Sequence, residues 1–557
     1  MPAGSSEPIE IEGQEVAAHR LGKLDPIRMR MDGLPLPHAR FPVPVRIVVA
    51  PDGSVTSAKL EGGFDSDEPD MPRTLFKSLK EAVTRAQAEV MALRYRPFLR
   101  KGHAVPATFE EMVLMIPADE PAAPHVDFPQ IKDWQSLRMT LQRTGCFGMC
   151  PSYSIEVRGD GTVLYSGRSY VAITGAHRGS ISQQPVAGIL EAFRQADYFS
   201  LRDKYILGAT DLPTYTTSIA FDGRSKKVED YAGLQVGMPA AVERLEKAID
   251  DLADSARWIK GDGATFAVLA AEKWNFKSPE AADTLARIVS YGSAEAVRDL
   301  IAAGVPTNGH DSANSSPLEI AAFRGDLQML NAILPAGPGT DPAVLSSALS
   351  RAAAAGKLEA VRLLLHSGAN ADAHLFSSKP PALEPPVVAA AASGVPAIVQ
   401  TILKYRPDIS ARGFEDRTAL IAAVYSWKSD EGEPVNRLEV VRLLLAAGAE
   451  VDARDDKGNT ALIKNAWNPD IALLLIQHGA DVNASNNEGW TPLYNASTPE
   501  LARVLLQHGA NLNVRNKRGE TPLEAARQYG NPGVVEILEA AQAGKLKNPR
   551  PPLVPPE

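Results

Sequence analysis

Several features that mark other classes of protein are missing from this sequence. Only two cysteines occur among 557 residues, and no His-x-x-x-His pattern accompanies them, so a four-ligand zinc site is not expected. No run of about 18 apolar residues is present, which argues against a membrane-spanning helix. Lys and Arg are scattered and the formal net charge is −9, so the concentrated basic face that nucleic acid needs is absent.

Signatures of common enzymes are also missing. The sequence contains no Walker-type Gly-rich loop, no Gly-x-Ser-x-Gly and no His-Glu-x-x-His. Asp203, Asp211 and Asp222 could serve in acid–base chemistry, but their spacing pairs none of them, and loop polarity explains them better. The Arg-Gly-Asp tripeptide at 158–160 precedes another Gly between two strand patterns, which indicates a hairpin turn rather than an adhesion motif. We therefore predict a protein that is not an enzyme and binds no cofactor or metal.

The length of the chain indicates several domains. At 557 residues it exceeds one hydrophobic core, and about three or four domains are expected. Residues 1–38 are polar and punctuated by Pro and Gly, which predicts a flexible leader, and residues 546–557 form a Pro-rich tail. The first residues show neither the basic region nor the apolar core of a signal peptide. The chain is therefore either cytoplasmic or numbered from a point after signal removal.

Residues 39–117 are predicted to form a small α+β domain. An alternating apolar run at 43–49 and a second strand from Val55 flank a Pro-Asp-Gly-Ser turn, which is typical of a hairpin. Apolar residues at helical spacing follow at 75–93. A strand-like run at 105–116 completes the domain.

The order of these elements and their short motifs resemble the C-terminal domain of the TonB family. The matching words are the Asp52-Gly53 turn, the helix that ends at Tyr95-Arg96-Pro97, and the Gly102 turn before Val105-Pro106. In that family an exposed strand edge can bind an extended peptide, so the resemblance implies an envelope peptide binder. Its energy-transducing members carry a membrane helix and a Pro-rich spacer, neither of which occurs here. A peptide-binding or packing module is therefore expected rather than a transport role.

A linker rich in Ala and Pro separates this domain from a second α+β domain, predicted at 126–262. Strands are expected on both sides of the string Arg-Thr-Gly-Cys-Phe-Gly-Met-Cys-Pro-Ser-Tyr at 143–153, and helices at 186–196 and 239–252. The arrangement resembles a bacterial domain of unknown function that is marked by an Arg-Thr-Gly-Cys-x-Gly-x-Cys-Pro-x-Tyr string. The resemblance implies a domain boundary and no activity.

The two cysteines, Cys146 and Cys150, lie in that string, in a predicted loop between two strands. A thioredoxin-like pair is separated by two residues and has its attacking thiol at a helix N-terminus, so a redox enzyme is the weaker interpretation. A structural disulfide is favoured, and two ordinary thiols stay as an alternative. A disulfide would add roughly 2 kcal/mol of stability and would imply an oxidising compartment. Together with the TonB resemblance, it favours a periplasmic or envelope-associated protein over a cytoplasmic one.

Residues 264–545 repeat two short words. Gly-x-Thr-Pro-Leu or its variant with Ala begins at 458, 489 and 519, which gives spacings of 31 and 30 residues, and Gly-Ala-x-x-Asp or Asn begins at 448, 479 and 509. This period and these words are the signature of ankyrin repeats. Thr caps the first helix, Pro suits its first position, and the Gly in the second word ends the second helix.

About eight such units are expected, the last with the polar character of a cap. The fifth contains an insertion at 426–437. The position after Thr-Pro-Leu, commonly His, is Ile463, Tyr494 or Glu524, so some repeats are expected to be less rigid. His478 and His508 each precede a helix-ending Gly, and a favourable interaction with the helix C-terminus explains them without a metal.

The sequence thus predicts a multidomain chain, with two small α+β domains followed by an all-α ankyrin solenoid. Its function is expected to be that of a scaffold that binds a protein partner through the concave side of the array. Aromatic and Arg side chains commonly anchor interfaces. The candidate binding residues are Trp467, Trp490, Tyr494, Asp456, Asn487 and Arg518. The alternatives are an enzyme or redox protein that acts through the cysteine-containing domain, and an envelope peptide binder that uses the TonB-like strand edge.

Overall fold

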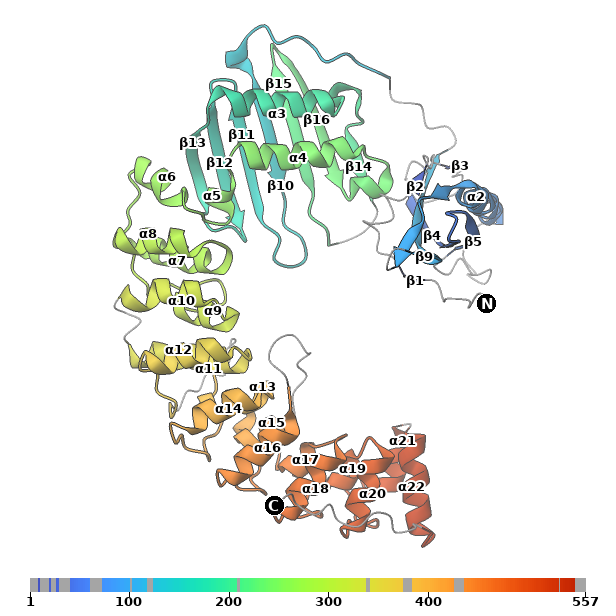
Figure 1. The fold of residues 1–557 in the computed structure, drawn as a ribbon, viewed down its shortest axis with the longest axis vertical. Coiled ribbons are helices and arrows are strands. Elements are labelled where there is room, and N and C mark those ends of the chain that lie inside the picture. Colours follow the sequence, from blue (N-terminus) through green and yellow to red (C-terminus); the bar gives the residue numbers. More distant parts are fainter. Residues whose placement is uncertain are drawn as a thin grey trace. The chain divides into compact units, whose positions relative to one another are not determined.

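The computed structural model describes residues 9–10, 20–21, 27–29, 41–60, 73–100, 103–117, 124–207, 211–336, 341–373, 383–424, 435–529 and 531–545. The chain divides into two compact units, Met1–Ile259 and Lys260–Glu557 (Figure 1). The first unit is rich in β-structure and the second is helical, which confirms the predicted fold class. Among the residues that the model describes, no helix combines the length and apolar character needed to cross a bilayer.

The N-terminal sheet is built around one long hairpin. Strand β4 (Phe41–Val49) pairs antiparallel with β5 (Val55–Leu60) and with β9 (Ala107–Pro117). Helix α2 (Arg73–Ala92) follows β5 in the chain. In the hairpin turn, Gly53 has φ +83° and a Cβ there would lie 1.9 Å from the Tyr95 carbonyl oxygen, so only glycine fits. Three short strands follow the helix, β6 (Arg94–Tyr95), β7 (Phe98–Arg100) and β8 (His103–Val105).

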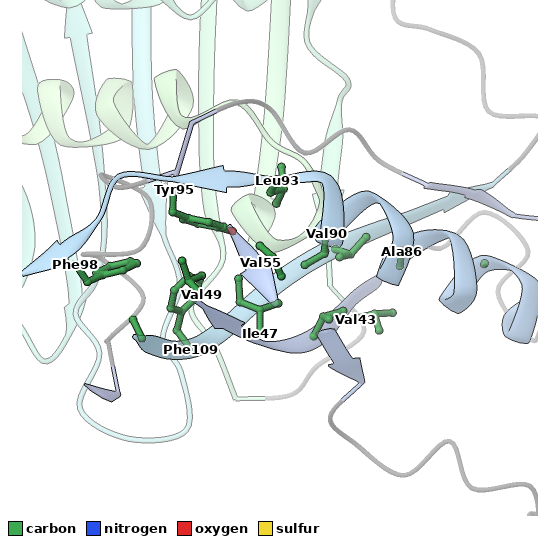
Figure 2. Packing of buried hydrophobic residues seen from close by; sticks show 14 residues of the cluster. Val43, Ile47, Val49, Val55, Ala86, Val90, Leu93, Tyr95, Phe98 and Phe109 are labelled. Carbon is green, nitrogen blue, oxygen red and sulfur yellow. The ribbon is translucent and has the colours of Figure 1, made fainter. Parts of the chain in front are cut away.

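The core of this domain lies between the sheet and α2 (Figure 2). The alternating residues of β4 from Val43 to Val49 are fully buried, because strand periodicity places them on one face. Ala86 and Val90 cover that face from the helix, and Tyr95 packs edge-on against Phe109 with ring centroids 5.1 Å apart. The apolar residues that alternate along β4 in the sequence are therefore the residues that are buried in the structure.

The prediction of a flexible leader at 1–38 is wrong for three short segments. Strands β1 (Ile9–Glu10) and β3 (Ile27–Met29) pair in parallel with β9, and β2 (Arg20–Leu21) pairs with β6. These strands are paired through backbone hydrogen bonds, which do not require an alternating apolar pattern. The sequence pattern therefore does not predict them.

The second domain is a seven-stranded sheet in the order β13-β12-β11-β10-β15-β16-β14. All neighbouring pairs are antiparallel except β14 with β16. The strands are β10 (Arg138–Arg143), β11 (Ser152–Arg158), β12 (Thr162–Ser169), β13 (Gly175–Ser180), β14 (Lys204–Ile206), β15 (Tyr215–Phe221) and β16 (Arg224–Tyr231). Strands β13 and β16 are mostly polar, which is why apolar alternation does not reveal them.

Two helices lie side by side across this sheet, α3 (Gln183–Gln195) and α4 (Ala240–Leu252) (Figure 1). Both correspond to predicted helices, and Pro239 is the residue before α4 rather than within its first turn. The domain ends at α5 (Ala256–Ile259), where the buried Trp258 stacks on Tyr165 with ring centroids 5.1 Å apart. Stacking and burial of this indole fix the C-terminal end of the domain against β12.

The helical unit begins with α6 (Thr265–Ala271) and continues, in the residues described, as eight pairs of helices. The first helices are α7 (Pro279–Tyr291), α9 (Pro317–Arg324), α11 (Pro342–Ala354), α13 (Pro386–Ser393), α15 (Ala419–Val424), α17 (Ala461–Lys464), α19 (Pro492–Asn495) and α21 (Pro522–Gln528). The second helices are α8 (Ala294–Ala302), α10 (Leu327–Ile333), α12 (Leu358–His366), α14 (Pro396–Leu403), α16 (Arg437–Ala446), α18 (Pro469–Gln477), α20 (Pro499–Gln507) and α22 (Pro532–Gln542).

Two of the three predicted Thr caps are present, at Thr460 and Thr521, whereas the Thr491 side chain makes no capping hydrogen bond. Thr521 accepts a hydrogen bond from the backbone of Glu524, whose side chain accepts one in return, and Ser316 forms the same capping box in an earlier unit. Gly479 and Gly509, in the second word, have φ of +93° and +89°, the left-handed conformation expected after a second helix. Most of the predicted insertion at 426–437 lies outside the described residues.

The turns between the paired helices differ in length. In the last pair the two N-caps, Thr521 and Asn531, are 10 positions apart. The separation is 8 positions for α17 and α18 (460 to 468) and 7 for α19 and α20 (491 to 498). These two units are therefore 2 and 3 residues shorter, which accounts for the spacings of 31 and 30 instead of the usual ~33. Their first helices, α17 and α19, have only 4 residues each.

Candidate protein-binding surface

The hairpin tips that precede the first helices are joined into a ladder. Three backbone hydrogen bonds link successive tips: Asp456 N–H to Glu415 O (3.1 Å), Asn487 N–H to Lys457 O (2.9 Å) and Lys517 N–H to Glu488 O (3.0 Å). The predicted residues Asp456, Asn487 and Arg518 lie on three of these tips, and all three are exposed. The ladder places them at regular intervals along one edge of the array.

Three of these tips are also stabilised by hydrogen bonds between an Asp or Asn side chain and the backbone of the same tip. The carboxylate or amide oxygen accepts hydrogen bonds from two backbone N–H groups of its own tip, at 2.7 to 3.0 Å. The three bracing residues are Asp455, Asn486 and Asn516. Such side-chain bonds hold a turn in one conformation. The exposed tip residues are therefore displayed on constrained backbone.

An aromatic cluster lies beside the last two tips. The Trp490 ring is 5.7 Å from the Tyr494 ring and 6.2 Å from the Tyr529 ring, measured between centroids. Arg518 on the tip donates a hydrogen bond from Nη1 to the Tyr529 hydroxyl at 3.1 Å. Tyr529 is 57% exposed, so much of the cluster faces solvent. The group of Trp490, Tyr494, Arg518 and Tyr529 is called the aromatic cluster below.

Within this cluster Tyr494 has a structural role. Its hydroxyl lies 2.8 Å from Val514 O and 2.5 Å from Glu520 O, and it can donate to these carbonyls of the following hairpin. Partial burial raises the pKa of this hydroxyl, which keeps it in the neutral donor form. Where His is common, the Tyr494 hydroxyl bonds to Glu520 O and the Glu524 carboxylate accepts from the Thr521 N–H at 2.7 Å, so these two units keep a side-chain hydrogen bond at that position.

The structure brings some of the predicted residues together and separates one. Trp490, Tyr494 and Arg518 share the aromatic cluster, and Asn487 donates from Nδ2 to Asp456 O at 3.1 Å on the neighbouring tips. Trp467 is 55% exposed but lies in the turn between α17 and α18, at the far end of α17 from the tip. It therefore belongs to another edge of the array.

Sequence reasoning missed Tyr529. It directly follows α21, in the unit that was interpreted as a polar cap. The available signal is an aromatic residue directly after the first helix of the last unit, next to the unit that contains Trp490. Trp490 and Tyr529 come from adjacent units, so their contact cannot be inferred from the repeat frame of either unit alone.

The second domain contains a group of largely buried carboxyl side chains, Glu246 and Asp250 on α4 and Asp230 on β16. Burial raises the pKa of Glu246 to about 9, and burial also raises the pKa values of Asp230 and Asp250. Asp250 accepts hydrogen bonds from the Tyr153 hydroxyl at 2.6 Å and from the Ser255 hydroxyl at 2.8 Å. In the part of the chain that the model covers, no three His, Cys, Asp or Glu side chains are placed to hold a metal ion together.

Two of the three aspartates singled out from the sequence, Asp222 and Asp203, lie elsewhere and act in the fold. Asp222 accepts backbone hydrogen bonds from Lys132 at 2.7 Å and Asp133 at 3.0 Å, which hold its pKa below the ordinary value. Asp203 pairs with the Lys226 ammonium at 2.6 Å. Neither of these two contacts the buried carboxyls, and each has a partner that accounts for it.

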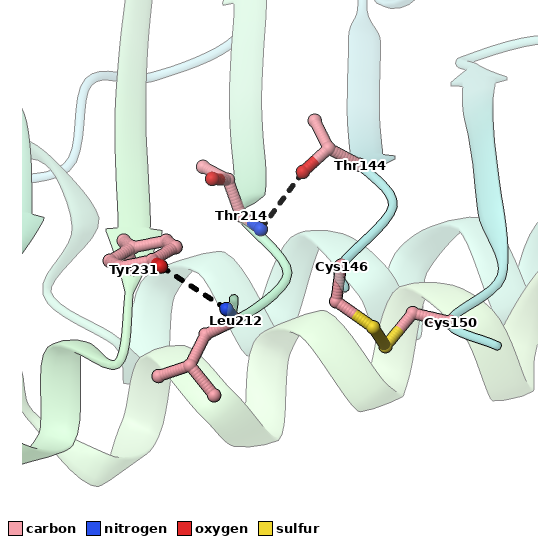
Figure 3. Close-up of a disulfide and its surroundings, with 6 residues drawn as sticks. All are labelled: Thr144, Cys146, Cys150, Leu212, Thr214 and Tyr231. Atoms are coloured by element: carbon pink, nitrogen blue, oxygen red, sulfur yellow. Dashed lines mark hydrogen bonds between the residues drawn. A yellow bond between two sulfur atoms is a disulfide. The ribbon is translucent and has the colours of Figure 1, made fainter. Parts of the chain in front are cut away.

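Cys146 and Cys150 lie in the loop between β10 and β11, as predicted, and the structure joins them in a disulfide with their Cα atoms 5.5 Å apart (Figure 3). Neither cysteine stands at a helix N-terminus. The feature that would activate a redox thiol is therefore absent from this loop.

Two family models match parts of the chain. The model described as "Domain of unknown function (DUF6438)" matches residues 137–253. The model described as "Ankyrin repeats (3 copies)" matches overlapping segments at 349–455, 387–486, 434–516 and 466–548. The first match covers the seven-stranded sheet with α3 and α4. The others cover the helix pairs from α11 onward, including the aromatic cluster.

Similar proteins with curated descriptions share the repeats. Ankyrin repeat and KH domain-containing protein mask-1 of Caenorhabditis elegans is 27% identical over 218 residues, which are 36% of this chain and 8% of that protein. E3 ubiquitin-protein ligase KEG of Arabidopsis thaliana is 29% identical over 217 residues, 38% of this chain and 11% of that protein. The 2-5A-dependent ribonuclease of Mus musculus is 52% identical over 54 residues, 9% and 7% of the two chains. This chain thus spans a small fraction of the length of each.

A solved structure also matches, the complex of a predatory endopeptidase from Bdellovibrio bacteriovorus with an immunity protein. The match has 26% identity and covers 34% of this chain and 96% of that chain. Its TM-score is 0.30, too low to support an argument. The family matches and the helix pairs together show that this chain carries a DUF6438 domain at 137–253 and ankyrin repeats in its C-terminal half.

Proposed function

We propose that this chain is an interaction protein whose ankyrin array binds a protein partner at the hairpin tips and the aromatic cluster. The observation that carries the proposal is the contact of the exposed Tyr529 with Trp490 and Arg518, whose backbone N–H groups are held by Asn486 and Asn516. Aromatic and Arg side chains dominate the energetics of many interfaces. A surface already held in one conformation loses little entropy when a partner binds.

The array offers internal controls for this proposal. Tyr405 follows α14 and is 53% exposed, and Trp467 is 55% exposed in the turn after α17. Both match Tyr529 in exposure, but neither is within ring contact of the aromatic cluster. Substitution of these residues removes a similar apolar area without changing the proposed surface.

The test is affinity capture with the full chain from separately prepared cytoplasmic and periplasmic fractions of the source cells. A protein captured by the wild type is then titrated against Arg518→Ala/Tyr529→Ala. We expect this variant to bind at least about 30-fold more weakly, the effect of losing an interface anchor. Tyr405→Ala and Trp467→Ala should bind like the wild type. Equal affinity of all four chains would contradict the proposed surface.

The location of the protein is a further part of this proposal. A disulfide persists in an oxidising compartment, and the Cys146–Cys150 pairing supports a periplasmic or envelope-associated protein. The test is trapping of free thiols with an alkylating reagent in intact cells. Protection of both cysteines until a reductant is added supports the periplasm, and immediate labelling supports the cytoplasm.

A second interaction is proposed for the N-terminal domain on its TonB-like features. Strand β5 stands at the end of the described sheet order β1-β9-β4-β5, so its outer side is an edge. An extended peptide could pair with such an edge by β-augmentation. Binding that persists in Arg518→Ala/Tyr529→Ala, and is lost when Pro replaces Ser57 in β5, would support this interaction over binding by the array.

A further inference from the structure

The loop between β10 and β11 displays two apolar side chains almost completely to solvent. Phe147 is 88% exposed and Met149 is 76% exposed. Among the large hydrophobic side chains of the described residues these are the two highest values. Isolated exposed hydrophobic residues are common on proteins, but two that are separated by a single residue on one loop tip are not explained by packing. No hydrogen-bonding or charged group on either side chain accounts for their position.

The loop is held in place beneath these side chains. The Cys146–Cys150 bond closes it, and Gly148 between the two apolar residues has φ +136°. Thr144 donates its backbone N–H to Thr214 O at 3.0 Å and accepts from the Thr214 N–H at its hydroxyl, also at 3.0 Å (Figure 3). The loop is therefore anchored to the start of β15 as well as to its own two strands.

The loop is the centre of a wider apolar end of the domain. Strands β10, β14 and β16 end, and β11, β13 and β15 begin, at this end of the sheet. Eight large hydrophobic side chains are exposed in the described residues from 124 to 259, and two of them, Val126 and Trp134, belong to other loops. The remaining six lie in loops or strand ends at the end defined by the disulfide loop: Phe147, Met149, Tyr170, Ile206, Leu212 and Leu234.

We propose that Phe147 and Met149 insert into an apolar pocket on a protein partner, at a surface separate from the ankyrin array. Aromatic and Met side chains are enriched in the cores of protein interfaces. A pocket requires its ligand to have a defined shape, and the disulfide and the two Thr144–Thr214 hydrogen bonds provide one. The neighbouring Leu212, exposed by 41% and anchored by a hydrogen bond from its N–H to the Tyr231 hydroxyl at 3.1 Å, adds apolar area beside the tip.

Two other candidates for binding the disulfide loop, a second copy of this chain and a lipid surface, fit the observations less well. Two side chains of this size offer on the order of 300 Å², so a pair of identical tips would bury about half of the ~1,200 Å² at the lower end of stable interfaces. Residues 144–151 contain no Lys or Arg, so the loop lacks the basic groups that draw proteins to anionic lipid surfaces. A concave partner remains, because the rim of its pocket can cover Leu212 and the other exposed side chains at this end as well as the tip, whereas two convex tips meet only at their ends.

The test uses the full chain with a photoreactive p-benzoylphenylalanine in place of Phe147, and a second chain with the same group in place of Trp134. Trp134 is 43% exposed in a different loop and serves as the matched control. We expect one protein adduct from position 147 that is absent from position 134. An adduct with lipid, an adduct of twice the mass of the chain, or no adduct would each overturn the proposal.

Capture alone is not sufficient, so the cross-linked protein is purified and titrated with variants. We expect Phe147→Asp to weaken binding by about 30-fold or more, Phe147→Leu to weaken it by less than about 5-fold, and Trp134→Asp to leave it unchanged. Because Phe147 is 88% exposed, the folded domain should tolerate these changes, and near-ultraviolet circular dichroism checks this. Binding that Phe147→Asp leaves intact would overturn the proposal. Binding that falls instead in Arg518→Ala/Tyr529→Ala would assign the partner to the array.

Discussion

Replacement of Glu246 by Gln should make the second domain more stable in neutral and alkaline solution. Glu246 lies on the buried face of α4 and is 6% exposed, and burial raises its pKa from the ordinary 4.5 to about 9. Above pH 4.5 the unfolded chain releases this proton, whereas the folded chain keeps it until the pH approaches 9. Gln has the same shape, carries no proton to lose, and can still donate a hydrogen bond to Asp230, with which Glu246 is hydrogen-bonded.

The magnitude follows from linkage between protons and folding. The folded wild type binds more protons than the unfolded chain between pH 4.5 and 9. Its free energy of unfolding therefore falls as the pH rises, by up to about 1.4 kcal/mol per pH unit for one proton. This stabilisation is fully present below pH 4.5 and is lost by pH 9. At pH 7, which is 2.5 units above the ordinary pKa of 4.5, Glu246→Gln should gain on the order of 3 kcal/mol relative to the wild type.

The assay is urea denaturation of the full chain from pH 5 to 8.5, followed by hydrogen exchange in peptides from residues 137–253. Glu191→Gln is the control, because Glu191 is exposed on the neighbouring helix α3 and is not one of the charges that raise the pKa of Glu246. We expect the wild type and Glu246→Gln to converge near pH 5 and to diverge as the pH rises. A smaller slope of the same sign should remain in the variant, since burial also raises the pKa values of Asp230 and Asp250. Parallel curves at all pH values would refute the reasoning.

Two further predictions concern the disulfide and the repeat contacts. Cys146→Ser/Cys150→Ser should lower the free energy of unfolding by about 2 kcal/mol, the chain-entropy contribution of so small a closed loop. Hydrogen exchange should become faster at the ends of β10 and β11, and unchanged exchange there would show that the disulfide does not constrain the loop. Tyr494→Phe should lower the free energy of unfolding by about 1 kcal/mol, because the Tyr494 hydroxyl bonds to Val514 O and Glu520 O, and hydrogen exchange should become faster at 514–522. Tyr405→Phe is the control, and equal effects of the two variants would contradict the inter-unit role of Tyr494.

The repeat array could be predicted from the sequence because each repeated word has a local cause. Thr521 and Gly509 act within a few residues of themselves, as an N-cap and as a helix-ending turn, so spacing alone identifies them. The alternating burial of β4 and the loop position of the cysteines follow equally from local pattern.

Contacts between segments that are distant in the chain could not be predicted. Tyr529 reaches Trp490 in the preceding unit, and a contact between units depends on how the units stack, which the sequence of either unit alone does not show. Trp467 is an exposed aromatic residue of the predicted kind, but its place in the turn between α17 and α18 depends on where the short helix α17 ends. The pairing of β1 and β3 with β9 is made by backbone groups, which all sequences share.

The central claim is that the ankyrin array binds a protein partner through the hairpin tips and the aromatic cluster. The most direct test is hydrogen–deuterium exchange of the full chain, alone and in complex with a protein that it captures. The account predicts slower exchange in peptides that cover 486–495 and 515–530, with no change in peptides from α14, where Tyr405 lies. Protection confined to residues 41–117 or 137–253, with the array unchanged, would contradict the account.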